Sequence, residues 1–257
     1  PTAKTMTIVK LFIDSSRARL ISPLFALNIL SKEGENNADS TDSCFFTAYT
    51  GARAAIGQSA KKIALFLHGL GSNAEDLIAL APLMAPDMPD VLFLSVDAPY
   101  PCDMAPVGYQ WFSLRDRDPT RILMELRRVK PLLEGYIGEV LDKYKLKNND
   151  LAFCGFSQGT MTSLYTALYA DEPYAGVLGY SGVLFLDEDE GPLSRLPICL
   201  IHGEADDVVP FRSLEMAEAA LKAQNFDLEI LACPHLGHSI DEKGLKKGTE
   251  FLARILG

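Results

Sequence analysis

Short apolar runs alternate with longer amphipathic stretches from about Cys44 to the C-terminus. Six of these runs are almost continuously apolar, which is typical of strands buried on both faces of a parallel sheet. They are Ile63–Leu67, Val91–Val96, Leu151–Phe156, Ala175–Tyr180, Pro197–Ile201 and Leu228–Ala232. Because helical stretches separate them, the pattern predicts an α/β fold with a mostly parallel central sheet and helices on both of its faces.

The clearest helical pattern covers Arg121–Tyr144, where apolar side chains recur every three or four residues. Pro131 lies inside this stretch and is expected to kink or restart the helix, because proline has no N–H to donate. A second helical run, Met161–Ala170, follows one of the predicted strands. The acidic segment Asp187–Glu190 is interpreted as a solvated turn.

The N-terminal part of the chain differs in composition from the rest. Ser31–Ser43 is polar and poor in large apolar side chains, which predicts a linker. Before it, basic residues precede the apolar stretch Leu20–Leu30, an order that is also seen in targeting peptides. Because Pro23 and Asn28 interrupt that stretch, we favour an extension that packs on the body. The predicted organisation is an extension and linker over residues 1–43 and a single α/β domain over residues 44–257.

Charge and cysteine content narrow the functional classes. The chain has 34 acidic and 24 basic residues and a formal net charge of -10, which disfavours a nucleic-acid partner. No apolar run approaches the roughly 20 residues that a membrane-spanning helix requires. The five cysteines are scattered without the spacing of a zinc site or a disulfide framework, which favours a reducing, cytoplasmic compartment. We therefore expect a small-molecule partner.

One pentapeptide, Gly155–Gly159, has the G-x-S-x-G pattern of a nucleophilic serine held on a sharp turn. It follows a predicted strand and precedes a predicted helix, which is the setting that this turn requires. A Cβ at either glycine would crowd the neighbouring strand or helix, and the turn exposes the Ser157 hydroxyl. The backbone N–H of Gln158 then lies at the start of a helix, where it can donate to an oxyanion.

A neutral serine needs a base and an orienting acid, and in this arrangement the acid comes before the base in the chain. The loop after the fifth predicted strand offers Asp206 and Asp207. The loop after the sixth offers His235 and His238. We prefer His238 as the base, because Gly237 permits a tight turn and a helix can begin just after it.

The other two of the four histidines are predicted to have a structural role. His68 and His202 directly follow apolar strands, and we expect them to orient loops through hydrogen bonds. The loop from His68 to Ser72 is the expected source of a second oxyanion donor. Its glycines let the Leu70 N–H turn inward.

Five ordered motifs extend from Phe66 to Ser239. They are F-L-H-G-L-G-S at Phe66–Ser72, Q-W-F at Gln110–Phe112, G-F-S-Q-G at Gly155–Gly159, H-G-x-x-D-x-x-V-P at His202–Pro210 and G-H-S at Gly237–Ser239. Together they resemble the phospholipase/carboxylesterase branch of the α/β hydrolases, which includes bacterial carboxylesterases and acyl-protein thioesterases. Two positions depart from that pattern: Thr160 stands where relatives commonly have glycine, and Glu204 where many have aspartate.

The resemblance implies the α/β-hydrolase fold and a serine hydrolase mechanism. Ser157 would be the nucleophile, His238 the general base and Asp206 the orienting acid, with Asp207 as the second choice.

The same resemblance implies an oxyanion hole and a substrate groove. Leu70 and Gln158 would donate the oxyanion hydrogen bonds. Trp111 would border the acyl groove, although a lone tryptophan is as often part of the core.

We expect hydrolysis of carboxylic esters with short to medium acyl chains through an acyl-enzyme, with no metal and no cofactor. The loop Ala98–Leu114, rich in Pro, Met, Tyr and Trp, is the expected groove. An acyl-protein thioesterase or lysophospholipase is the nearest alternative, because the same triad attacks the same carbonyl. A ligand-binding module with little turnover is the alternative from another class, and the intact Ser, His and Asp set argues against it. The partner would be a small acyl ester or thioester, and a homodimer stays open.

Overall fold

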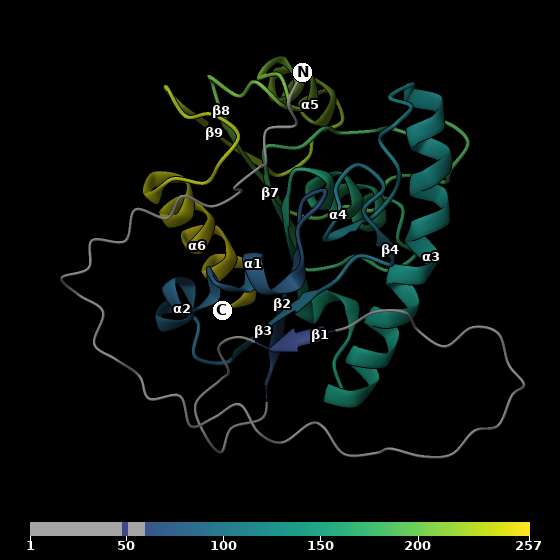
Figure 1. Ribbon diagram of the computed structural model, residues 1–257. Coiled ribbons are helices and arrows are strands. Elements are labelled where there is room, and N and C mark those ends of the chain that lie inside the picture. The colour runs from purple at the N-terminus through teal and green to yellow at the C-terminus, as the bar shows by residue number, and fades with distance from the viewer. Residues whose placement is uncertain (1–47, 51–59) are drawn as a thin grey trace, which may run out of the picture.

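The centre of the molecule is a seven-stranded sheet in the order β1-β3-β2-β6-β7-β8-β9 (Figure 1). The computed structural model describes residues 48–50 and 60–257, so the predicted extension and linker over residues 1–43 lie outside the described residues. Six strands are parallel: β2 Lys62–Leu67, β3 Val91–Val96, β6 Leu151–Phe156, β7 Gly176–Tyr180, β8 Ile198–Gly203 and β9 Leu228–Cys233. Strand β1, Ala48–Thr50, pairs antiparallel with β3 and was not predicted.

Helices cover both faces of the sheet, and each face has its own hydrophobic core (Figure 1). Alternate residues of β2 point to opposite cores: Ile63 and Leu65 to the first, Ala64 and Phe66 to the second. The first core is covered by α3 Pro119–Tyr144, α4 Gln158–Leu168 and α5 Arg212–Ala223. The second is covered by α1 Ala74–Ile78, α2 Ala81–Met84 and α6 Glu242–Leu256. The predicted α/β-hydrolase fold, with helices on both faces, is confirmed.

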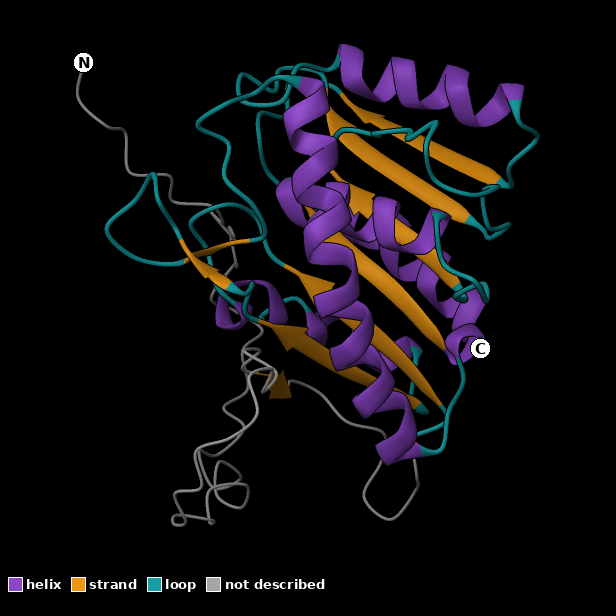
Figure 2. Cartoon of the chain, turned by 90° about the vertical axis from the view of Figure 1, so that its right-hand side faces the viewer, coloured by secondary structure: helices purple, strands orange, loops and turns teal. Residues whose placement is uncertain are grey.

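Helix α3 differs from the expectation at Pro131. It runs unbroken through that residue for 26 residues and crosses the face of the sheet (Figure 2). Proline removes one helical hydrogen bond. Burial of a stripe that includes Leu126, Val129 and Leu133 compensates for that loss, because each buried apolar side chain contributes about 1.5–3 kcal/mol.

The loop Ala98–Leu114 contains a small hairpin that the sequence pattern does not predict. Its strands are β4 Tyr100–Pro101 and β5 Tyr109–Gln110, and it stands away from the main sheet (Figure 2). The Tyr109 N–H donates to the Ser72 carbonyl at 2.8 Å, which joins the hairpin to the loop after β2. Gly108, at φ +82, passes so close to that loop that a Cβ would overlap its backbone.

The acidic segment Asp187–Glu190 is not simply a solvated turn, and that prediction is wrong at Asp187. The Asp187 side chain is 2% exposed and pairs with Arg127 of α3 through Nε at 2.6 Å and Nη2 at 2.5 Å. Tyr165 of α4 donates to the same carboxylate at 2.8 Å. Asp187 therefore holds the connection between β7 and β8 against α3 and α4.

Three of the cysteines, Cys154, Cys199 and Cys233, are buried in the second core. A buried free thiol of this kind packs as a small hydrophobe. Cys102 is half-buried, and Cys44 lies outside the described residues. Within the described part of the chain, no helix has both the length and the apolar character needed to cross a membrane.

Candidate active site

Ser157 lies at the sharp turn between β6 and α4. Its backbone has φ 54 and ψ -115, a region that strains any residue with a Cβ. Both flanking glycines are required for this turn. A Cβ on Gly155 would lie 2.6 Å from the Thr160 backbone, and one on Gly159 would overlap the Leu67 carbonyl. These contacts are the steric conflicts with helix and strand that the pentapeptide predicts.

Asp206 and His238 lie together beside this turn. His238 Nδ1 donates to Asp206 Oδ2 at 2.7 Å, so Nε2 of the neutral ring keeps its lone pair. That Nε2 is buried and has no hydrogen-bond partner among residues 60–257. The His238 ring centroid is 4.9 Å from that of Phe156, the residue before Ser157. A free acceptor nitrogen therefore lies close to the serine turn.

The loops after β8 and β9 meet because Gly203 has no side chain. A Cβ there would overlap the Leu236 carbonyl. The close approach allows two backbone hydrogen bonds, from Glu204 N–H to Cys233 O at 3.0 Å and from Ala205 N–H to Leu236 O at 2.9 Å. These bonds hold the acid-bearing loop against the histidine-bearing loop.

The Asp206 carboxylate is surrounded by donors. Its Oδ1 accepts from the N–H groups of Val208 at 2.9 Å and Val209 at 2.8 Å. Burial on its own would raise the pKa of Asp206, but hydrogen bonds from His202, His238 and the Val209 N–H outweigh it and hold the pKa well below its ordinary range. Asp206 is therefore ionised at neutral pH.

The competing acid and base candidates are in a different environment. Asp207 and His235 are both exposed, and His235 has φ 62. The side chain of Asp206, in contrast, is 0% exposed and that of His238 is 5% exposed. The structure thus brings Asp206 and His238 together and leaves Asp207 and His235 in solvent.

His68 and His202 make the loop hydrogen bonds expected of them. His68 Nδ1 donates to Gly69 O at 2.7 Å, and its Nε2 accepts from Ala98 N–H at 3.0 Å. Burial lowers the pKa of His68, so the ring is neutral at pH 7. His202 lies within β8 rather than after it, and its Nε2 is 2.9 Å from Val209 O.

The proposed oxyanion donors flank the serine turn. The loop of Leu70 packs against it, since a Cβ on Gly69 would be 3.4 Å from Ser157 Cβ, and Gly71 adopts φ +76. Gln158 is the first residue of α4, where an N–H has no partner inside the helix. Neither the Leu70 nor the Gln158 N–H donates to an acceptor within residues 60–257.

The Gln158 side chain has a role that sequence reasoning missed. It is fully buried, its Oε1 accepts from Trp111 N–H at 2.9 Å, and its Nε2 donates to Phe112 O at 2.7 Å. These bonds join the Q-W-F motif to the serine turn. The paired occurrence of the two motifs is the signal that could have suggested this contact.

Trp111 occupies the core position that was the alternative to a groove-lining role. Its side chain is 0% exposed, and its indole N–H donates to His68 O at 2.8 Å. As placed, it offers no surface to a substrate. Its contacts instead support the loop that carries Leu70.

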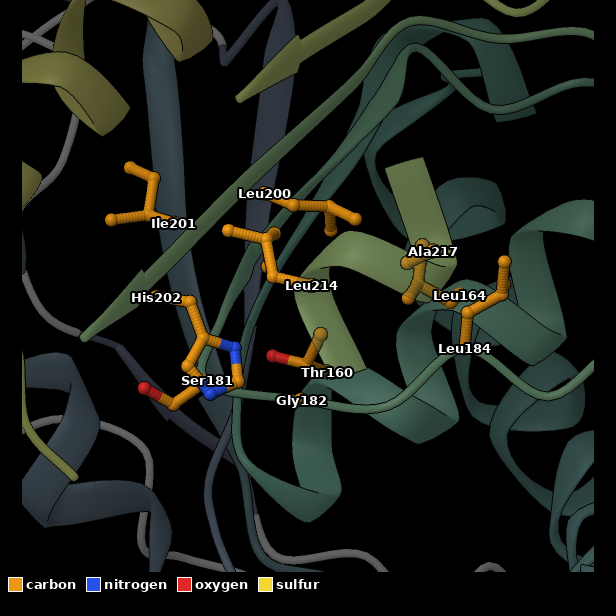
Figure 3. Close-up of a pocket in the computed structure, with 11 residues that line it drawn as sticks. Thr160, Leu164, Ser181, Gly182, Leu184, Leu200, Ile201, His202, Leu214 and Ala217 are labelled. Atoms are coloured by element: carbon orange, nitrogen blue, oxygen red, sulfur yellow. The ribbon is translucent and has the colours of Figure 1, made fainter. Parts of the chain in front are cut away.

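A small cavity lies between α4, α5, β7 and β8 (Figure 3). Thr160, Ser181 and His202 contribute polar groups to a mostly aliphatic lining. Its volume is about 10 Å³, far below the roughly 300–1,000 Å³ of a ligand pocket. Thr160 fills much of this region, because a Cβ on Gly179 or Gly182 would lie 2.5 Å from its side chain. The departure at Thr160 therefore affects core packing.

The loop Ala98–Leu114 is more mixed in character than its sequence suggests. Met104 is 50% exposed and Val107 74% exposed, so the hairpin presents apolar side chains to solvent. Beside it is an open hollow of about 580 Å³. Charged side chains, Asp103, Arg115 and Arg117, contribute to its lining together with apolar ones.

Comparison with known proteins places this site in a family. The family model described as Phospholipase/Carboxylesterase matches residues 54–256. The chain belongs to this family. It is accordingly a hydrolase of the carboxylesterase type. A probable carboxylesterase of Oryza sativa subsp. japonica is 28% identical over 200 residues, which cover 71% of this chain and 83% of that protein.

Further relatives are similar to this chain over most of their length. Acyl-protein thioesterase 1 of Aspergillus fumigatus is 25% identical over 214 residues, which cover 75% of this chain and 87% of that protein. The crystal structure of esterase PE8 aligns with a TM-score of 0.76 and 33% identity over 82% of this chain and 99% of that one. The resemblance inferred from the five motifs is confirmed.

Proposed function

We propose that this family member hydrolyses carboxylic esters through a covalent acyl-enzyme on Ser157. One observation carries the proposal: the 2.7 Å bond from His238 Nδ1 to Asp206 leaves Nε2 free, buried and beside the serine turn. A neutral imidazole in that tautomer can accept the serine proton.

In the proposed reaction, Ser157 Oγ attacks the ester carbonyl while His238 Nε2 takes the hydroxyl proton. The carbonyl oxygen becomes an oxyanion that accepts from the Leu70 and Gln158 N–H groups. His238 then gives its proton to the departing alcohol. Water, deprotonated by the same nitrogen, attacks the acyl-enzyme and releases the acid. Asp206 orients His238 and stabilises it while it is charged.

The nucleophile and the base are tested by single substitutions, with a substitution at an exposed neighbouring histidine as the control. In hydrolysis of p-nitrophenyl acetate, Ser157→Ala and His238→Ala are each expected to lower kcat by a factor on the order of 10⁴ to 10⁶, because triad members act as a unit. His235→Ala serves as the matched control and should stay near the wild-type rate. A loss below tenfold for Ser157→Ala or His238→Ala would refute the mechanism.

The proposed base also predicts how activity depends on pH. Histidine side chains ordinarily titrate near pH 6.5, and His238 has to be neutral to accept a proton. Hydrogen bonds hold the pKa of Asp206 low, so Asp206 stays ionised and adds no second step to the activity profile between pH 5 and 8. We expect kcat/KM to rise through one step over this range. A flat profile would remove His238 from the role of base.

Short to medium acyl chains are the proposed substrates. Apolar side chains exposed on the hairpin, including Met104 and Val107, support an acyl groove, although the charges of the neighbouring hollow restrict its apolar area. For p-nitrophenyl esters, kcat/KM should increase up to roughly fourfold per methylene and then level off, because a buried methylene contributes about 0.8 kcal/mol. A steady fall from acetate upward would instead indicate a closed pocket for small acyl groups.

Alkyl esters, thioesters and lysophospholipids present the same carbonyl to the serine and differ in the leaving group. A thioesterase role is favoured as the second candidate, because the Aspergillus relative is named an acyl-protein thioesterase. The same acyl group is presented as an alkyl ester, a thioester and a lysophospholipid, and the three values of kcat/KM are compared. If kcat/KM for the alkyl ester is the lowest of the three, the carboxylesterase proposal is replaced by a thioesterase or lysophospholipase role, whichever substrate has the highest kcat/KM.

A further inference from the structure

We propose that His202 is a positioning residue that fixes the Asp206 carboxylate through a second imidazole hydrogen bond. His202 Nε2 lies 2.9 Å from Val209 O and 3.3 Å from Asp206 Oδ2. Both of these atoms are acceptors, so Nε2 has to carry a proton that the two share. The inference rests on the proposed function, because it concerns the residue behind the proposed triad acid.

With His202 included, both oxygens of the Asp206 carboxylate face two donors each. Oδ1 accepts from two backbone N–H groups, and Oδ2 lies between the imidazoles of His202 and His238. An ionised carboxylate has about four acceptor sites, so this set occupies them. Rotation of the carboxylate away from His238 would break bonds on both oxygens. His202 thus completes the set of contacts that fixes the direction in which Asp206 holds His238.

The surroundings of His202 leave few alternative donors for Oδ2. The His202 side chain is 1% exposed and that of Asp206 is 0% exposed. The His202 ring packs edge-on against Phe211, with centroids 6.1 Å apart, and the cavity of Figure 3 lies along β8 beside it. Thr160 and Ser181, the polar residues that line that cavity with His202, are both uncharged. Among the described residues, the titratable side chains in contact with the carboxylate are His202 and His238.

A positioning role has an electrostatic consequence that simple packing does not have. The shared N–H of His202 partly screens the negative charge of Asp206 from His238. If it is removed, more of that charge acts on His238 and favours its protonated form. The acid limb of the activity profile would then move to higher pH.

The test compares His202→Leu, which removes the donor, with His202→Gln, whose amide N–H reaches a similar position. His202→Leu is expected to lower kcat/KM for p-nitrophenyl acetate about tenfold or more and to move the acid limb up by roughly half a pH unit. His202→Gln should recover most of the rate and the wild-type limb. Phe211→Leu is the packing control: it should lower the melting temperature and leave the limb unchanged.

Two results would overturn the proposal: a folded His202→Leu with wild-type rate and limb, or a His202→Gln as impaired as the leucine variant. If the variants do not fold, NMR of the ¹⁵N-histidine-labelled wild-type protein decides between the tautomers. A proton on Nε2 of His202 supports the proposal, and an unprotonated Nε2 contradicts it. Ser157→Ala is measured in parallel, because retained activity there would refute the proposed function itself, whatever the His202 variants do.

Discussion

Two buried aspartates, Asp187 and Asp206, show how different partners give the same side chain different roles. Their side chains are 2% and 0% exposed, and each lies in a connection that follows a central strand. The Arg127 hydrogen bonds lower the pKa of Asp187 to about 2, and hydrogen bonds also hold the pKa of Asp206 low. Burial and ionisation are therefore similar, and the partners differ.

Asp187 has a permanent counter-charge. Arginine stays protonated at every pH at which proteins fold, so the bidentate pair with Arg127 is neutral wherever Asp187 is ionised. Tyr169 adds two contacts, accepting from Asp187 N–H at 2.6 Å and donating to Asp187 O at 3.1 Å. The cluster joins the β7–β8 connection to α3 and α4, and Arg127 balances the charge of the buried Asp187.

Asp206, by contrast, is held by donors that carry no fixed charge. Backbone N–H groups and imidazoles stabilise the anion and leave its net negative charge in place. That charge is then available when His238 becomes positive during the proposed reaction. The comparison teaches that a buried carboxylate with hydrogen-bond donors but no permanent cation is the better candidate for a catalytic acid.

The largest difference between the two clusters is expected in turnover. Asp206→Asn should lower kcat by a factor on the order of 10⁴, because the amide neither stabilises charged His238 nor keeps its tautomer. Asp187→Asn should change kcat less than about threefold, and so should Asp207→Asn, which is exposed. Steady-state assays of folded variants measure this. An equal loss in Asp206→Asn and Asp187→Asn would remove the distinction between the clusters.

Stability should separate the two clusters far less than turnover does. Asp187→Asn removes the buried carboxylate partner of Arg127 and leaves the exposed Asp189, 2.8 Å away, as a remaining partner. We expect a loss of about 2 kcal/mol in the free energy of unfolding. The cost is kept moderate because Arg127 is 36% exposed and can be hydrated. Asp206→Asn should also destabilise the fold, by about 1–3 kcal/mol, because the low pKa of Asp206 means that its hydrogen-bond donors favour the ionised side chain in the folded protein. Urea denaturation followed by circular dichroism measures both losses, and an unchanged stability of Asp187→Asn would contradict the structural role of its cluster.

The Asp187 contribution should also depend on pH. Its folded pKa, about 2, lies below the ordinary value of about 3.9, so the ionised pair stabilises the fold above pH 4. This stabilisation is lost as pH falls from 4 towards 2. The stability difference between wild type and Asp187→Asn should therefore narrow over that interval. A difference that stays constant down to pH 2 would show that the ionised pair is not its source.

The smallest effect is expected from outside both clusters. Deletion of residues 1–40 should leave turnover of a small soluble ester nearly unchanged, since every proposed catalytic residue follows them in the sequence. Kinetics on the purified, shortened protein test this. A product that is insoluble would show that the apolar part of the extension covers the core.

Most of the candidate site could be predicted from the sequence, because each part of it depends on residues that are close together in the chain. The serine turn needs two glycines within five residues, and a Cβ at Gly155 or Gly159 has no space in the structure. The acid and base follow two strands that were predictable from their apolar runs. Their meeting depends on Gly203, whose missing side chain is visible in the H-G-x-x-D motif.

The features that sequence reasoning missed depend on partners far away in the chain. Asp187 looked solvated because Arg127 lies 60 residues before it. The Gln158 side chain reaches Trp111 across 47 residues, and periodicity carries no information about such pairs. Pro131 was expected to disturb α3, but the apolar stripe around it is buried along the whole helix.

Labelling with a fluorophosphonate probe tests the central claim most directly, because the probe reacts with an activated serine and stays attached. We predict one label per chain, located on Ser157 by peptide mass spectrometry. The labelling rate of Asp187→Asn should remain within a few-fold of wild type, and that of Asp206→Asn should fall at least about 100-fold. Label on another residue, or equal labelling rates in Asp206→Asn and wild type, would contradict the account.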